Sequence, residues 1–257
     1  ALSLYQKKGR IHMIEITYLL NSGFLVRVGR TLLVFDDFKD PAGAVDAAVE
    51  AADFDHLYFF ASHGHFDHFD AHICAYEAKT ERYILSDDIR CTKALSSFDQ
   101  AKLVFLKTYA SWQDEHIAVA SFDSTDIGTS FRVVLKDEGV TLFHAGDFNW
   151  WDWTGEPQEQ RKLAENAFRK QMKKLKGLEA DLAFFPVDGR LGPSIDKGVK
   201  VFCAETEVRA LVTMHSVGYT AWQPPEGFFG AGRSIPAWSP RTPGEKACLK
   251  DGQFLAD

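Results

Sequence analysis

The residues of this chain that could do chemistry are concentrated in Ser62-His63-Gly64-His65-Phe66-Asp67-His68. Imidazole nitrogens and carboxylate oxygens are ligands that bind divalent zinc, manganese and iron. His63 and His65 are two residues apart in an extended segment, so their side chains point the same way and can hold one metal ion. Asp67 and His68 follow after a turn and can serve a second ion nearby. The alternative, a polar loop with incidental histidines, leaves so many adjacent metal-binding side chains without a purpose.

The element that positions this motif is the preceding apolar run, residues 57–61, whose length and aromatic content predict a buried strand. A His-x-His-x-Asp-His motif after a buried strand resembles the metallo-β-lactamase superfamily. The order of the remaining elements is compatible with that superfamily from Met13 to about Gly218. The resemblance implies an α/β fold in a single domain, the αββα four-layer sandwich with two similar halves.

The resemblance implies roles for three further residues that each follow a strand-like run. Asp36 ends the run 31–35 and is implied to hold a ligating imidazole in one tautomer, although a solvated strand end would look the same. Asp147 stands in a Gly-Asp after the run 140–143. It is implied to bridge the two metals, with a turn-capping aspartate as the alternative. His215 ends another apolar run and is implied to complete the second metal site.

The chain departs from the superfamily pattern at one ligand. A histidine usually stands at a strand end between the first motif and the Gly-Asp, but residues 120–128 contain none. Asp126 is the best substitute, because a carboxylate can ligate where an imidazole did, and Asp123 and Ser124 are further candidates. The remaining alternative is a weaker site made by the first two histidines of the motif, the Gly-Asp carboxylate and water. A harder ligand set would favour manganese, iron or magnesium more than three histidines do.

The segment Asn149-Trp150-Trp151-Asp152-Trp153 follows directly on the Gly-Asp. One interpretation is an aromatic wall over the substrate, which predicts Trp150, Trp151 or Trp153 near the metals. The alternative is packing of the next helix against the sheet. Arg190, in a turn after another buried run, is a candidate for holding a carboxylate or phosphate. The alternative for this residue is a surface arginine.

Alternating strand-like and helix-like segments predict a layered α/β fold. In the long amphipathic helix expected over 157–176, the inner face is expected to contain Leu163, Ala167, Met172 and Leu175. Residues 218–257 show little periodicity and are expected to wrap the core or the rim of the site. The other expected helices cover 42–52, 70–80, 87–95 and 199–207. The expected strands lie within 14–28 and at 31–35, 57–61, 83–85, 102–106, 116–122, 131–135, 140–143, 181–187 and 210–215.

The composition excludes some classes of protein. The formal net charge of -7 disfavours nonspecific nucleic-acid binding, which needs a basic face. The four cysteines form no Cys-x-x-Cys pair, which indicates free thiols in a reducing compartment. No run is apolar enough to span a membrane and no signal peptide opens the chain, so a cytoplasmic protein is expected. Residues 1–12 are expected to be a vector-derived or disordered leader, and the predicted domain is 13–257.

The prediction is a metal-dependent hydrolase with two divalent metal ions, zinc first and manganese or iron as alternatives. The metals would lower the pKa of a bound water to about 7 and polarise a carbonyl or phosphoryl oxygen, and Asp67 would orient the hydroxide or shuttle its proton. The expected substrate is a small molecule with an ester, lactone, amide or phosphoester bond. The resemblance points to the branch of ascorbate-phosphate lactonase-type and phospholipase D-type hydrolases. A phosphodiesterase or nuclease using the same site and a noncatalytic metal-binding sensor are the alternatives.

Overall fold

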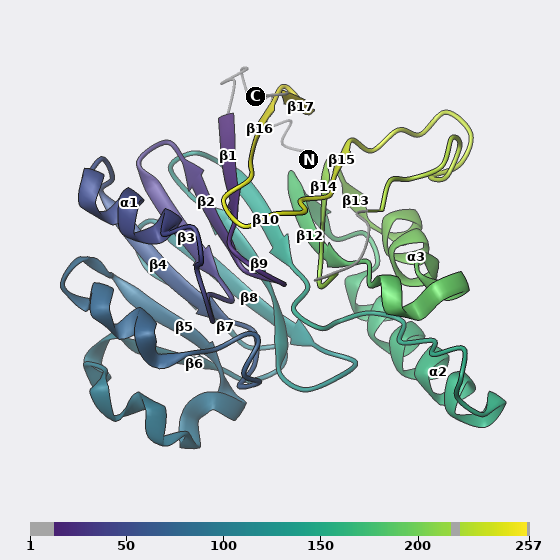
Figure 1. The fold of residues 1–257 in the computed structure, drawn as a ribbon, viewed down its shortest axis with the longest axis horizontal. Helices are drawn as coiled ribbons and strands as arrows, with labels where there is room; N and C mark the ends of the chain where they lie inside the picture. Colours follow the sequence, from purple (N-terminus) through teal and green to yellow (C-terminus); the bar gives the residue numbers. More distant parts are fainter. Residues whose placement is uncertain (1–12, 217–221, 256–257) are drawn as a thin grey trace, which may run out of the picture.

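The first of two large β-sheets contains most of the N-terminal half of the chain (Figure 1). The structure is a computed structural model that describes residues 13–216 and 222–255, so the expected leader, residues 1–12, lies outside it. In the described residues this sheet has the order β17-β16-β1-β2-β3-β4-β5-β6. Its strands are β1 (Met13–Tyr18), β2 (Phe24–Val28), β3 (Thr31–Phe35), β4 (His56–Ala61), β5 (Arg82–Ser86), β6 (Leu103–Leu106), β16 (Lys246–Lys250) and β17 (Gln253–Leu255).

The second sheet comes mainly from the C-terminal half and has the order β15-β14-β12-β10-β9-β8-β7 in the described residues. A separate two-stranded ribbon pairs β11 with β13 in parallel. The strands of the second sheet are β7 (Ser111–Gln113), β8 (Ile117–Asp123), β9 (Thr129–Leu135), β10 (Val140–His144), β12 (Leu182–Pro186), β14 (Leu211–Met214) and β15 (Ala237–Trp238). Those of the ribbon are β11 (Glu179–Ala180) and β13 (Glu207–Val208).

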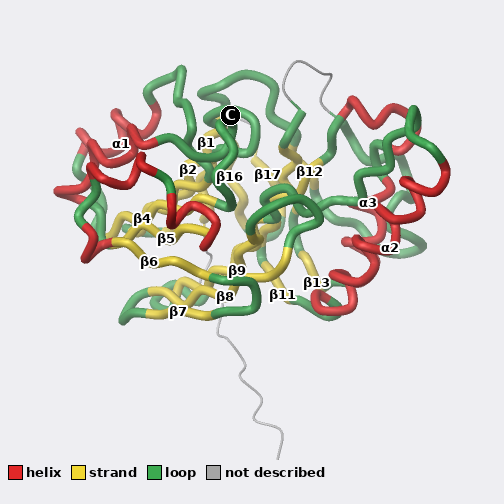
Figure 2. Tube along the Cα trace, turned by 90° about the horizontal axis from the view of Figure 1, so that it is seen from below, coloured by secondary structure: helices red, strands yellow, loops and turns green. Residues whose placement is uncertain are grey.

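Helices cover the outer face of each sheet, so that the strands lie between two helical layers (Figure 2). On the first sheet these are α1 (Ala44–Ala51) and short 3₁₀ segments, and on the second sheet they are α2 (Gln158–Leu175) and α3 (Lys197–Glu205). None of the helices in the described part of the chain is long and apolar enough to cross a membrane. The 3₁₀ segments are η1 (Ala71–Lys79), η2 (Asp87–Cys91), η3 (Lys93–Ser97), η4 (Gln100–Lys102) and η5 (Gly189–Ser194).

Alternation along the buried strands separates two hydrophobic cores. In β3, Leu33 and Phe35 belong to the core between the two sheets, whereas Leu32 and Val34 belong to the core under α1 and η1. Successive strand side chains point to opposite faces, so a strand with cores on both sides must be apolar throughout. This explains the continuous apolar runs in the sequence. Two sheets packed face to face with helices outside form the αββα sandwich that the resemblance implied.

The structure refines two expectations about the elements and contradicts a third. The helices expected at 70–80 and 87–95 are 3₁₀ helices, and the second is divided into η2 and η3. The inner face of α2 is built on Phe168, Met172 and Leu175, while Leu163 is 55% exposed, because Phe168 stacks on Phe148 with ring centroids 5.0 Å apart. The C-terminal tail does more than wrap the core, since β16 and β17 extend the first sheet through antiparallel pairing of β16 with β1.

The polar loops of interest all follow the carboxyl ends of strands. The strands β3 and β4 run parallel in one sheet, and β10, β12 and β14 run parallel in the other. The carboxyl ends of parallel strands meet at one edge of a sheet, which is where open α/β proteins place their ligands. The fold therefore gathers residues 36, 62–68, 145–149, 188–190 and 215 at one end of the sandwich.

Candidate metal centre

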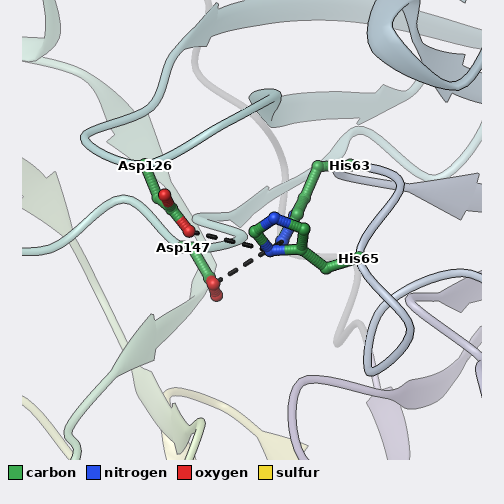
Figure 3. A group of neighbouring side chains, drawn as sticks. All are labelled: His63, His65, Asp126 and Asp147. Carbon is green, nitrogen blue, oxygen red and sulfur yellow. Dashed lines mark hydrogen bonds and ion pairs between the residues drawn. The ribbon is translucent and has the colours of Figure 1, made fainter.

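The first of two donor groups joins the β4 loop to the loops after β8 and β10, and Figure 3 shows its four side chains. His63 Nε2 lies 3.0 Å from His65 Nδ1 and 3.6 Å from Asp147 Oδ2. His65 Nδ1 lies 3.7 Å from Asp126 Oδ2. One ligand atom from each of the four residues falls within 4.8 Å of all the others. The structure thus places Asp126, the expected substitute for the missing histidine, beside His65, His63 and Asp147.

The second donor group consists of Asp67, His68 and His215, with ligand atoms that also lie within 4.8 Å of one another. Asp147 belongs to this group as well through its other oxygen, because its Oδ1 lies 3.2 Å from His68 Nε2 and 3.4 Å from His215 Nε2. Asp67 Oδ2 is 3.9 Å from His68 Nε2. The two carboxylate oxygens of Asp147 therefore face the two groups separately, as expected of a residue that joins two metal sites.

The buried atoms of the second group fit a cation. His68 Nε2 and Asp147 Oδ1 are buried and face each other at 3.2 Å, and neither makes a hydrogen bond to a described residue. Burial opposes protonation of His68, but the facing carboxylates of Asp147 and Asp36 outweigh it and raise its pKa to about 10. Burial likewise opposes ionisation of Asp147, yet the surrounding imidazoles hold its pKa far below the usual range. A divalent cation would supply the positive charge that these buried groups demand.

Asp36, expected to orient a ligating imidazole, makes that contact. Its Oδ2 accepts from His68 Nδ1 at 2.8 Å and from the Ser62 hydroxyl at 2.7 Å, and its Oδ1 accepts from the Ser62 backbone N–H at 2.7 Å. With Nδ1 held by Asp36, Nε2 is the nitrogen of His68 that faces Asp147, and it is the one that would give its lone pair to a metal in exchange for a proton. The buried carboxylate thus fixes both the tautomer of His68 and the start of the motif loop.

Asp188 makes the corresponding contact on the other side of the centre, and the sequence analysis did not single it out. Its buried carboxylate follows β12, and its Oδ2 accepts from His215 Nδ1 at 3.0 Å. Arg190 pairs with the same carboxylate, with its Nε 2.9 Å from each oxygen. A signal existed in the sequence, because a buried apolar run ending in an aspartate is the pattern that pointed to Asp36.

Asn21 is a second residue that the sequence analysis did not single out. It adopts a left-handed conformation with φ 55° between β1 and β2. Its Nδ2 donates to Asp67 Oδ2 at 3.1 Å, and its carbonyl accepts from the backbone N–H of His215 at 3.1 Å. Asparagine tolerates this conformation better than most residues. The turn therefore ties the first motif to the last strand end.

The three tryptophans divide between two places. Trp151 donates from Nε1 to the Asp147 carbonyl at 2.9 Å and packs edge-on against His215, with ring centroids 5.4 Å apart. Trp153 stacks on Trp151, and the Arg190 guanidinium lies 5.5 Å from its ring centroid. Trp150 instead stacks on Phe168 of α2 and lines a separate cavity of about 750 Å³ beside that helix.

Three further histidines, His144, His116 and His72, are not members of either donor group. His144 is buried and donates from Nε2 to the Ser22 carbonyl at 2.9 Å, and burial lowers its pKa, so it stays neutral and supports the β10 loop. His116 stacks on His56 at 3.6 Å between ring centroids, at the opposite end of β8 from Asp126. His72 contacts Asp37, with Nε2 and Oδ2 3.3 Å apart.

Two glycines let neighbouring loops approach the motif loop. A Cβ on Gly128, where φ is +82°, would lie 2.2 Å from the Ser62 carbonyl oxygen and 2.4 Å from His63 Cβ. A Cβ on Gly146, where φ is +54°, would lie 2.7 Å from Ser62 Cβ. Real Cβ atoms do not come this close, and both conformations disfavour other residues. The contact that brings Asp126 and Asp147 up to His63 thus requires glycine at both positions.

Gly128→Ala is expected to lower the free energy of unfolding by at least about 2 kcal/mol, because it adds a steric clash to a strained backbone. Thermal and urea unfolding measure the loss. Gly155→Ala is the matched control, since nothing lies within 4 Å of a Cβ at Gly155 and its φ is not left-handed. Equal stability of the two variants would contradict the close approach of the loops.

This chain is similar to known proteins in structure but not detectably in sequence. No protein-family model matches the sequence, and no curated protein matches it significantly. Among solved structures, the metallo hydrolase Igni18 from the archaeon Ignicoccus hospitalis is similar with a TM-score of 0.63 and 14% identity, over 92% of this chain and 98% of the other.

Two further structures show the range of proteins with this architecture. The metallo-β-lactamase fold protein YhfI from Bacillus subtilis has a TM-score of 0.55 and 12% identity, over 91% of this chain and 98% of the other. CmlA, a diiron β-hydroxylase from Streptomyces venezuelae, has a TM-score of 0.50 and 12% identity, over 81% of this chain and 45% of the other. At such identities the likeness concerns the backbone. The chain therefore has the metallo-β-lactamase fold.

Proposed function

We propose that this protein is a metal-dependent hydrolase that uses a metal-activated water on a small-molecule ester, lactone, amide or phosphoester. The observation that carries the proposal is a pair of donor groups joined by one carboxylate and open to solvent on one side. The side chains of His63 and His68 are fully buried, while those of His65 and Asp126 are each 48% exposed. A small substrate could therefore reach the centre from the His65 side.

The proposed ligands are the four histidines and three aspartates of the two groups, with zinc as the first candidate metal and manganese or iron as alternatives. Carboxylates make up nearly half of the set, which also suits metals harder than zinc. When bound, such ions lower the pKa of a coordinated water and polarise a carbonyl or phosphoryl oxygen. The proposed ligands are His63, His65, Asp126, Asp147, Asp67, His68 and His215.

Asp67 is the proposed group for orienting the attacking water and taking its proton. Its side chain is 30% exposed, so it can contact both the buried group and an incoming molecule. The hydrogen bond from Asn21 Nδ2 to Asp67 Oδ2 restricts the carboxylate to one orientation. Proton transfer needs a base within hydrogen-bond reach of the proton it removes, and a fixed carboxylate beside the ligands meets that condition.

Trp151 and Trp153 are the proposed apolar wall of the substrate site, and Arg190 the proposed contact for an anionic substituent. Trp151 is in contact with both Asp147 and His215, and Trp153 continues the stack outward beneath Arg190. Binding energy from the unreactive part of a substrate supports its orientation at the reacting centre. Trp150 is not part of this wall, because it packs against Phe168 of α2.

We expect the zinc- or manganese-loaded protein to hydrolyse at least one member of a panel of esters, lactones, amides and phosphodiesters. Chelation should abolish turnover and metal addition should restore it, because the proposed nucleophile depends on the metal. The assay is run with and without oxygen, since a diiron hydroxylase shares the fold. Protein that takes up neither zinc nor manganese would refute the proposal.

Asp67→Asn is the companion variant, assayed at saturating metal because it removes a proposed ligand, and it is expected to lose most turnover even when the remaining ligands hold their ions. Metal binding without turnover on any bond of the panel would favour the noncatalytic sensor. Turnover restricted to phosphodiesters and nucleic acids would favour the phosphodiesterase or nuclease, which the net charge of -7 disfavours.

Trp153→Ala is expected to lower kcat/KM about tenfold, equivalent to about 1.4 kcal/mol of binding, with metal content and melting temperature unchanged. Trp150→Ala is the contrast, expected to lower the free energy of unfolding by about 3 kcal/mol because it removes packing against α2. Kinetics, metal content and thermal melting on both variants separate the two roles. A Trp153→Ala variant that has a lower melting temperature but unchanged kcat/KM would contradict the proposed role of Trp153 in substrate binding.

A further inference from the structure

The second donor group is held by partners that lie outside it. Each of its three ligands has a hydrogen bond of 3.1 Å or less to such a partner, and two of the partners, Asp36 and Asp188, are buried carboxylates. These partners come from β-strand ends and a tight turn, which are rigid elements. The contacts are His68 Nδ1 to Asp36 Oδ2 at 2.8 Å, His215 Nδ1 to Asp188 Oδ2 at 3.0 Å, and Asn21 Nδ2 to Asp67 Oδ2 at 3.1 Å.

The first donor group lacks such support at two of its ligands. The side chains of His65 and Asp126 are each 48% exposed. Within the described residues, their only polar side-chain contacts are with one another and with His63, at 3.7 Å and 3.0 Å respectively. Exposed side chains lose conformational entropy when an ion fixes them, and this opposes binding. Buried ligands that are already oriented have lost that entropy on folding, so binding costs them less.

The two groups also differ in what a cation must displace. His63 Nε2 and His65 Nδ1 lie 3.0 Å apart, so these two ligand atoms satisfy each other by a hydrogen bond that an ion must break. In the second group, His68 Nε2 and Asp147 Oδ1 are buried and lie 3.2 Å apart as an ion pair, and neither makes a hydrogen bond to a described residue. These buried atoms rely on each other's charge, which a cation between them would satisfy more fully.

From this asymmetry we propose that the Asp67–His68–His215 group with Asp147 Oδ1 binds its divalent cation first and retains it, while the His63–His65–Asp126 group exchanges its cation. Partners that orient a ligand are each worth about 10- to 100-fold in metal affinity. Three supported ligands against two unsupported ones predict affinities at least about tenfold apart. The exchangeable ion would sit on the solvent-facing side. This inference rests on the proposed metal centre.

The test is a zinc titration of the chelator-stripped, full-length chain in competition with a chromophoric chelator. The expected result is two binding classes of one ion each, at least about tenfold apart in affinity. Asp126→Ala should remove the weaker class and leave the tighter one. Asp188→Asn should weaken the tighter class by about 10- to 100-fold, because asparagine cannot replace the charge that supports His215.

Asp181→Asn is the matched control for Asp188→Asn. Asp181 precedes β12 as Asp188 follows it, and it also pairs with an arginine, Arg209, at 2.9 Å. The control should leave both zinc affinities unchanged. If Asp188→Asn does not fold by circular dichroism, Asn21→Gly takes its place, since glycine keeps the left-handed backbone and removes only the amide that holds Asp67.

Two classes of equal affinity would overturn the inference, as would loss of the tighter class in Asp126→Ala or unchanged tight binding in Asn21→Gly. These outcomes differ from failure of the proposed function. A chain that binds two zinc ions equally and turns over substrate refutes only the ranking of the two groups. A chain that binds no zinc or manganese refutes the metal centre itself.

Discussion

The carboxylate of Asp147 imposes the main electrostatic constraint on this protein. It is buried between His63, His68 and His215, with one oxygen facing each donor group. Removing a carboxylate from water costs several kcal/mol unless opposite charge and hydrogen bonds compensate for it. The surrounding imidazoles provide part of that compensation. In the proposed centre, a divalent cation beside each oxygen would provide the rest.

The sandwich meets this constraint by placing the donor groups, and the carboxylates that hold their histidines, at strand ends of both sheets. Asp36 and the motif loop come from the first sheet, and Asp147, Asp188 and His215 come from the second. Cores on both faces of each sheet fix the strand ends, so the side chains they present are positioned with little freedom. The loop that carries Asp126 is the exception, because it approaches the motif through Gly128 while its carboxylate stays half-exposed.

The sequence was most informative where several metal-binding types of side chain lie close together in one short segment. The motif from His63 to His68 could be recognised because its ligands are neighbours in sequence, and His215 could be recognised because an apolar strand ends there. The layers followed from the alternation of strands and helices. The long apolar runs were correctly predicted to be buried strands, because a strand with a hydrophobic core on each face must be apolar throughout.

The rest depends on contacts between distant parts of the chain. Asn21 meets Asp67 across 46 positions and Asp188 meets His215 across 27. A strand-end aspartate could be seen at Asp188, but nothing local shows which distant residue either partner meets. The close approach at Gly128 is likewise invisible until the loops are placed. In α2 the inner face contains Phe168, which stacks on Phe148, whereas Leu163 is exposed, and helical spacing alone did not decide between these two faces.

The most direct test of the shared role of Asp147 is a crystal structure of the zinc-loaded protein with anomalous data collected at the zinc absorption edge. The account predicts two anomalous peaks, one within bonding distance of His68 and His215, the other of His63 and His65. The two oxygens of Asp147 should each contact one of them. A single peak, or two peaks with Asp147 bound to neither, would contradict the account.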